Sequence, residues 1–207
     1  MRNYIISRGD INHIIDVQLD LNGSYDPNWR ENTTMLDFQT AAIHEYCGEF
    51  LKEIEGRWKF FGNCSVDLQK AVFELVDTVC FLTSAFITRA PVIHESNTFY
   101  SVNSVKDIEA LSDGVAAGDR SVILQMINDL SNKISTKNLS SILTRYDLSM
   151  FISFNLVLLD VTAEEYMIAH SKKVSLNYHR AFGGAMDGTY DKTNEPELTI
   201  NLSTERK

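Results

Sequence analysis

The chain has 207 residues, a formal net charge of −9 at pH 7 and 44% hydrophobic residues. This length is enough for one domain with a substantial core, and we expect a single globular unit over residues 1–207. The excess of acidic residues excludes a broad surface for nucleic acid or for anionic membranes, because both partners carry negative charge themselves.

The cysteines and the hydropathy of the chain indicate the cellular compartment. The three cysteines, Cys47, Cys64 and Cys80, lack CxxC spacing, so neither a disulfide framework nor a zinc site is expected. The most apolar run, residues 150–161, is too short to span a bilayer, and the N-terminus lacks the apolar core of a signal peptide. We therefore predict a protein of the reducing cytoplasm that binds neither a membrane nor nucleic acid.

The first half of the chain reads as three helices. Apolar residues recur at helical spacing over residues 11–22 and again over 36–54. A third and stronger pattern covers residues 66–87, with Ser65 as the expected N-cap. Because this third segment is apolar on most of its circumference, we expect it at the centre of the fold.

The second half adds an insert and three more helices. Residues 88–119 are mixed and polar, which predicts a loop-rich insert or cap with one short helix near residues 105–111. Further helical patterns cover residues 122–134, 139–159 and 163–180, the last preceded by Thr162 as a capping residue. Strand alternation and internal repeats are lacking, so the predicted fold class is all-α, a helical bundle.

Acidic side chains stand on two of these helices. Glu74 and Asp77 lie three residues apart inside the most apolar segment, and therefore project from one face of it. Burying two carboxylates without compensation is costly, and oxygen coordination of Mg²⁺ would compensate them. Pairing with Arg or Lys would do the same. On the preceding helix Glu45, Glu49 and Glu53 form a stripe that is either part of such a site or a solvated face.

Four stretches carry a family resemblance. The segment "FELVDTVCFLTSAFI" resembles the ExxD helix of the all-α nucleoside triphosphate pyrophosphatases, in particular the dimeric dUTPases and the phage dCTPase/dUTPase proteins. "VQLDLNGSYDPNWRE", "RWKFFG" and "KVSLNYHRAFGGAMDGTYDK" are similar to further motifs of the same enzymes, in the same order. The resemblance implies an all-α enzyme that hydrolyses dUTP to dUMP and pyrophosphate.

The resemblance also implies a cofactor, an assembly and a set of site residues. It implies Mg²⁺, more than one ion per site, and a homodimer, for which the apolar residues 150–159 are the candidate face. The cytoplasm would be that of the host if the gene is phage-borne. The implied metal ligands are Glu45, Glu49, Glu74 and Asp77, with Glu49 and Glu45 also catalytic. The implied substrate contacts are Gln18, Asn22, Trp58, Lys173, Asn177, Arg180, Tyr190 and Lys192. Aromatic candidates for a base-stacking wall are Trp29, Trp58, Phe60 and Phe61.

The C-terminal motif reads as a flexible tail over residues 183–207. Its glycines and the turn at Asp187-Gly188 would let Tyr190 and Lys192 fold back toward the site. Val174 and Ala185-Met186 replace the Asn and the Tyr-Lys of the family motif, which leaves dCTP or another, modified deoxynucleotide as alternative substrates.

One departure affects the metal site. Tyr46 stands where the family's ExxE pair has its first Glu, so either Glu45 or Glu53 would have to complete the pair with Glu49. The same substitution is the basis of a second alternative, a nucleotide- or partner-binding protein that has kept the fold and lost catalysis.

Overall fold

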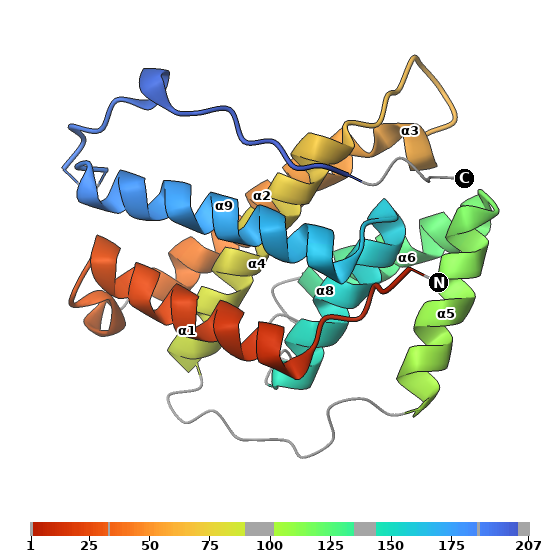
Figure 1. Cartoon of the computed structure of the whole chain (residues 1–207), viewed down its shortest axis with the longest axis horizontal. Helices are drawn as coiled ribbons and strands as arrows, with labels where there is room; N and C mark the ends of the chain where they lie inside the picture. Colours follow the sequence, from red (N-terminus) through yellow and green to blue (C-terminus); the bar gives the residue numbers. More distant parts are fainter. Residues whose placement is uncertain (1, 33, 90–101, 135–143, 186, 203–207) are drawn as a thin grey trace.

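The computed structural model describes residues 2–32, 34–89, 102–134, 144–185 and 187–202, and every regular element in these ranges is helical (Figure 1). The α-helices are α1 (Arg8–Tyr25), α2 (Met35–Glu53), α3 (Glu55–Trp58), α4 (Leu68–Arg89), α5 (Val102–Ala116), α6 (Arg120–Ile134), α8 (Arg145–Leu159) and α9 (Ala163–Phe182). Two short 3₁₀ helices, η1 (Trp29–Glu31) and η2 (Lys192–Asn194), complete the set. The prediction of an all-α fold is confirmed.

Helix α4 is the central element, as its all-round apolar pattern predicts. It packs against α1, α2, α8 and α9. Its span Leu68–Thr88 is long and apolar enough to cross a membrane, but 83% of the apolar window is buried inside the fold. Its hydrophobicity therefore belongs to a core helix, whose neighbours remove its side chains from water.

Two helix starts were predicted from capping residues, with different outcomes. Thr162 caps α9 as expected, because its hydroxyl accepts the N–H of Glu165 while the Glu165 carboxylate accepts the N–H of Thr162. The prediction of Ser65 as the cap of α4 is wrong. Asp67 takes that role, since its Oδ1 accepts the N–H of Lys70 at 3.1 Å, and a carboxylate is as good an N-cap as a hydroxyl.

The loop-rich insert predicted over residues 88–119 is also corrected. Residues 102–116 form α5, a helix of 15 residues that is longer than the short segment expected. Ile108 and Val115 are buried one above the other on its inner face, and this burial against α6 and α8 outweighs the weak local pattern. Residues 90–101, like residues 139–143 of the helix expected at 139–159, lie outside the described ranges.

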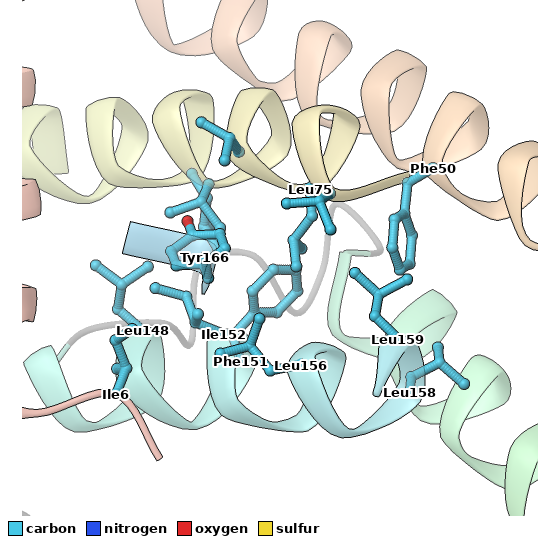
Figure 2. Close-up of a cluster of buried hydrophobic side chains, with 14 of the residues drawn as sticks. Ile6, Phe50, Leu75, Leu148, Phe151, Ile152, Leu156, Leu158, Leu159 and Tyr166 are labelled. Atoms are coloured by element: carbon cyan, nitrogen blue, oxygen red, sulfur yellow. The ribbon is translucent and has the colours of Figure 1, made fainter. Parts of the chain in front are cut away.

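The apolar side chains of helix α8 are buried in the core of the same chain. Figure 2 shows Phe151, Ile152 and Leu156 projecting from α8 toward Leu75 of α4, and all four side chains are at most 1% exposed. The prediction that residues 150–159 form a dimer face is therefore wrong: these side chains are covered by α4 and α5 of the same chain. A helix that is apolar on all sides must be buried, but its sequence pattern does not show whether the same chain or a second copy buries it.

The last helix and the chain that follows it bring the functional motifs together. Helices α1 and α9 lie side by side and both cross α4 (Figure 1). After α9 the chain turns and runs back along it, so that Ile200 is buried near the start of α4. The N-terminal motif, the carboxylate helix and the C-terminal motif thus share one side of the bundle.

We predict that Phe151→Ala lowers the free energy of unfolding by about 3–5 kcal/mol, because the substitution leaves a cavity between α8 and α4 that the packed neighbours cannot fill. Urea unfolding followed by circular dichroism measures it. Phe182→Ala is the matched control at a side chain that is 77% exposed, where we expect a change within about 0.5 kcal/mol. Equal losses at both positions would contradict the assignment of α8 to the core.

Candidate active site

Three carboxyl groups from two packed helices face one another. The contacts between α2 and α4 run antiparallel: the N–H of Asp67 donates to the carbonyl of Glu53 at 2.9 Å, and further along the helices the side chain of Tyr46 meets that of Phe81. Between these two points, the carboxyl of Glu74 donates a hydrogen bond to the carboxylate of Glu49. Asp77 follows Glu74 on the same face of α4, as the spacing predicts.

The environment lets Glu74 keep its proton well above the pH at which a free carboxyl group loses it. Burial first, and then the nearby charge of Asp77, raise the pKa of Glu74 to about 7, although Lys173 acts in the opposite direction. The hydrogen bond to Glu49 adds to the shift. Two ionised carboxylates this close repel each other, and the proton on Glu74 removes that repulsion.

Asp77 is compensated by a cation instead. The Nζ atom of Lys173, on α9, lies 2.6 Å from Oδ2 of Asp77, and the two side chains are only 12% and 11% exposed. Burial raises the pKa of Asp77 above its ordinary value, and the ammonium of Lys173 opposes that rise. The pair therefore joins α4 to α9 at the carboxylate face.

The donors suit a hard divalent cation, although they do not yet form a cage. Within the described ranges, no group of three or more His, Cys, Asp or Glu side chains is gathered closely enough to hold a metal ion. The proton that Glu74 donates to Glu49, and the ammonium of Lys173, supply positive charge where a cation would supply it. Carboxylate oxygens are the ligands that Mg²⁺ prefers, so the residues fit this ion.

The first position of the expected ExxE pair is aromatic in the structure too. The ring of Tyr46 stacks on that of Phe81 with centroids 5.3 Å apart. Burial, and then the charges of Asp77 and Glu45, raise the pKa of Tyr46 to about 12, so its hydroxyl stays protonated. Glu45 is exposed beside it, while Glu53 lies half-buried one turn beyond Glu49 on the other side.

The basic residue of the C-terminal motif is held by an acid that the sequence did not single out. The Nε and Nη2 atoms of Arg180 donate to the two carboxylate oxygens of Glu195 at 2.8 and 2.7 Å. Its Nη1 atom donates to Oδ1 of Asn177 at 3.1 Å, so these two side chains are in contact, as their spacing on the helix allows. The hydroxyl of Tyr25, at the end of α1, donates to the carbonyl of Asn177 at 3.1 Å.

The turn after α9 brings the rest of this motif back to Arg180. A side chain on Gly183 would come within 2.7 Å of the Tyr190 ring, and Gly184 has φ +93°, so both positions require glycine. The hydroxyl of Tyr190 donates to the carboxylate of Glu195, and the charge of Lys192 also acts on that carboxylate. The chain therefore folds back after α9, and Tyr190 and Lys192 act on the carboxylate that Arg180 binds.

The polar pair on α1 forms a second cluster against α4. Gln18 donates from Nε2 to Oδ1 of Asn22 at 2.8 Å, and the hydroxyl of Ser84 donates to the same atom at 3.0 Å. The Nδ2 atom of Asn22 is buried without a hydrogen-bond partner. This arrangement leaves the amide nitrogen of Asn22 as a fixed, unused donor beside α4.

The aromatic residues expected to form a base wall have different surroundings in the structure. Trp29 is only 4% exposed and belongs to the core. Trp58 donates from Nε1 to the carbonyl of Leu51 at 3.2 Å, carries Lys59 over its ring, and sits on α3, which packs against α6. Phe60 and Phe61 follow it as exposed side chains. The aromatic pair beside the carboxylates is Tyr46 with Phe81.

Sequence reasoning missed three residues of the site. Ser84 and Phe81 stand at i+7 and i+4 from Asp77, on the same face of α4, and this spacing could have identified them. Glu195 has no such signal, because it lies in an irregular segment and reaches Arg180 only after the chain reverses.

A sequence model of a protein family described as dUTPase matches residues 10–184 of the chain. The matched span runs from the first turn of α1 to the turn after α9, so it contains Glu49, Glu74, Asp77 and Arg180 and ends before Glu195. No curated protein matches the chain.

The proton on Glu74 gives a prediction for stability. The folded, metal-free protein keeps the Glu74 proton up to a pKa of about 7, whereas the ordinary value is 4.5. The unfolded state then binds fewer protons than the folded state between these values, so the free energy of unfolding falls as the pH rises from about 4.5 to 7 and this contribution is level outside that window. Glu74→Gln should flatten the fall.

Urea unfolding in the presence of a chelator, at half-unit pH steps, measures this slope. Glu109→Gln, at an exposed position of α5, is the matched control and should leave the slope unchanged. A Glu74→Gln variant with the same pH profile as the parent would contradict a raised pKa of Glu74 in its contact with Glu49.

Proposed function

The chain belongs to the dimeric all-α dUTPase family and hydrolyses dUTP to dUMP and pyrophosphate, and we propose that the carboxylate face of α2 and α4 is the site of this reaction. The family is Mg²⁺-dependent. The observation that carries the proposal is the convergence of Glu49, Glu74 and Asp77, with Lys173 and Arg180 of α9 beside them. Negative and positive groups meet here as a metal–phosphate complex requires.

We assign Mg²⁺ to Glu49, Glu74 and Asp77, with exposed Glu45 as the fourth oxygen donor. Tyr46 stays protonated and stacked on Phe81, so it takes no part as an anionic ligand. Bound there, the ion would supply the positive charge that the Glu74 proton and the Lys173 ammonium supply without it. The ammonium of Lys173 would then be available to a substrate phosphate, because its side chain is long and flexible.

The residues have separate parts in the reaction. Bound Mg²⁺ would supply charge neutralisation of the triphosphate and a lowered pKa of a coordinated water. A carboxylate oxygen of Glu49 accepts the proton of the attacking water, whose oxygen forms a bond to the α-phosphorus. The bond from that phosphorus to the bridging oxygen breaks, and pyrophosphate leaves. Lys173 and Arg180 hold the phosphate oxygens, Arg180 through its planar fork.

Helix α4 also has the right length to bind the nucleoside. Ser84 follows Asp77 by seven residues, a rise of about 10 Å along the helix, with Phe81 between them. A nucleotide whose phosphates lie at Asp77 would place its sugar near Phe81 and its base near Ser84 and Asn22. The free amide nitrogen of Asn22 is a donor, which suits a carbonyl oxygen of uracil; the exocyclic amino group of cytosine is itself a donor.

We infer that the active assembly is a homodimer of the cytoplasm. Cys47, Cys64 and Cys80 are free thiols, as a reducing compartment requires. Since residues 150–159 are covered within the chain, the dimer must use another face, and we propose the exposed pair Phe60 and Phe61, which are 68% and 71% exposed.

For the dimer, we predict a sedimentation coefficient of two copies at micromolar concentration, and dissociation by Phe60→Ser with Phe61→Ser, because this change removes apolar area from the interface. Phe182→Ser, at another exposed phenylalanine, should leave the dimer intact. A monomeric parent protein would rule out the assembly, and a dimeric double variant would rule out this face.

For catalysis, we predict that Glu49→Gln and Asp77→Asn each lower kcat/KM for dUTP by at least about 100-fold, the scale expected when a metal site is disrupted. Glu53→Gln, on the same stripe of α2, is the matched control and should change kcat/KM less than about threefold. Pyrophosphate release with Mg²⁺ present measures both, and circular dichroism checks that each variant is folded. Unchanged turnover in Asp77→Asn would place the site elsewhere.

The same assay separates the alternative substrates. The rate of pyrophosphate release from dUTP should exceed the rate from dCTP. Ser84→Ala should reduce this difference in rate, because only Gln18 then holds the amide of Asn22 in place. Equal rates with both nucleotides in the parent protein would contradict the recognition of a uracil carbonyl by the Asn22 amide.

A further inference from the structure

The phosphate-binding fork of Arg180 is occupied by a carboxylate of the same chain. Glu195 accepts two hydrogen bonds from it, at 2.8 and 2.7 Å, and the two side chains are 24% and 17% exposed. This is the two-pronged geometry in which an arginine binds a phosphate. Tyr190 donates to the same carboxylate, and Lys192 adds its charge. Three groups of the C-terminal motif, Arg180, Tyr190 and Lys192, therefore act on Glu195.

The segment that carries Glu195 is fastened beyond it. Ile200 is 4% exposed in the core, and its backbone makes a reciprocal pair of hydrogen bonds with Gln69: the Ile200 N–H donates at 3.0 Å and the carbonyl accepts at 2.5 Å. Lys172 donates to the carbonyl of Thr199 at 2.5 Å. Figure 1 shows the segment running back along α9 toward the start of α4. Glu195 is thus held near Arg180 from both sides.

We propose that Glu195 is a built-in competitor for the phosphate site, which substrate must displace and which returns to Arg180 when product leaves. The inference rests on the proposed role of Arg180 as a phosphate-binding residue. It adds a residue outside the family match, which ends at residue 184. Glu195 would then determine KM and the strength of product inhibition, and would take no part in the chemical step.

The physical argument is one of local concentration and charge. Because Glu195 is tethered on both sides, its carboxylate competes at a high effective concentration with any free anion. A single phosphate offers little more to Arg180 than the carboxylate does. The triphosphate of the substrate brings more charge and further contacts at the carboxylate face, so it displaces Glu195 from Arg180. Pyrophosphate or a monophosphate makes fewer contacts, so Glu195 replaces either of them more easily. Glu195 therefore weakens the binding of every phosphate ligand that uses Arg180, and this limits the inhibition by product at the expense of a higher KM.

Glu195→Gln tests this, because Gln keeps the size and loses the charge. We expect KM for dUTP to fall about five- to tenfold, the contribution of one charge-assisted pair at a partly exposed site. Inhibition by added inorganic pyrophosphate should strengthen by a similar factor, and kcat should not rise. Glu197→Gln, two residues further along the same exposed segment, is the matched control and should change neither constant.

A second variant keeps the test independent of the Arg180 pair itself. Gln69→Ala removes the fastening at Ile200 and lowers the effective concentration of Glu195, so it should reduce KM in the same direction. An unchanged or raised KM in Glu195→Gln would overturn the proposal, because Glu195 would then merely support Arg180.

Arg180→Ala separates this proposal from the proposed function. If Arg180 binds phosphate, KM rises in Arg180→Ala, and adding Glu195→Gln to that variant has no further effect. Arg180→Ala with an unchanged KM would remove the phosphate role and the competitor with it. A raised KM in Arg180→Ala together with a silent Glu195→Gln would remove the competitor alone.

Discussion

Glu74 and Asp77 lie on the helix around which the whole protein packs, and their compensation is the constraint on which the other contacts depend. Helix α4 must be apolar to contact α1, α2, α8 and α9, yet one of its faces carries two acidic side chains. Burial raises the pKa of both. Two neighbouring helices offset this cost in different ways: Glu49 of α2 accepts a hydrogen bond from the Glu74 carboxyl, and Lys173 of α9 supplies an ammonium to Asp77.

This arrangement has consequences for the order in which the site is assembled. Lys173 can reach Asp77 only if α9 starts and ends where it does, and the capping box at Thr162 together with the glycine turn at Gly183 fixes both ends. The proton and the ammonium keep the metal-free face nearly neutral. A cation that took their place would meet a face that is already folded, and its binding would stabilise the folded state.

The parts of the fold that the sequence predicted are those whose pattern has one physical meaning. An apolar stripe at helical spacing predicted α1, α2, α6 and α9, and the pair Glu74 and Asp77 was identified by its spacing alone. The run at residues 150–159 has two meanings, since an all-round apolar helix is equally suited to a core and to an interface, and α8 proved to be core. Helix α5 was underestimated because its stability comes from packing against α6 and α8. Trp58 was assigned to the site from its motif, and that assignment stays a prediction; its indole N–H donates to the carbonyl of Leu51, two residues beyond Glu49 on α2.

Glu195 marks the limit of what spacing can reveal. The glycines at 183 and 184 indicated that the chain reverses, but not how far it returns, and that distance decides which side chain meets Arg180. It is determined by Ile200, whose burial beside Gln69 fixes the length of the returning segment. An apolar side chain without any chemistry of its own thus positions an acid on the guanidinium. A shift of that anchor by one residue would change the partner of Arg180. The core contact at Ile200 and the electrostatics of the phosphate site therefore depend on each other.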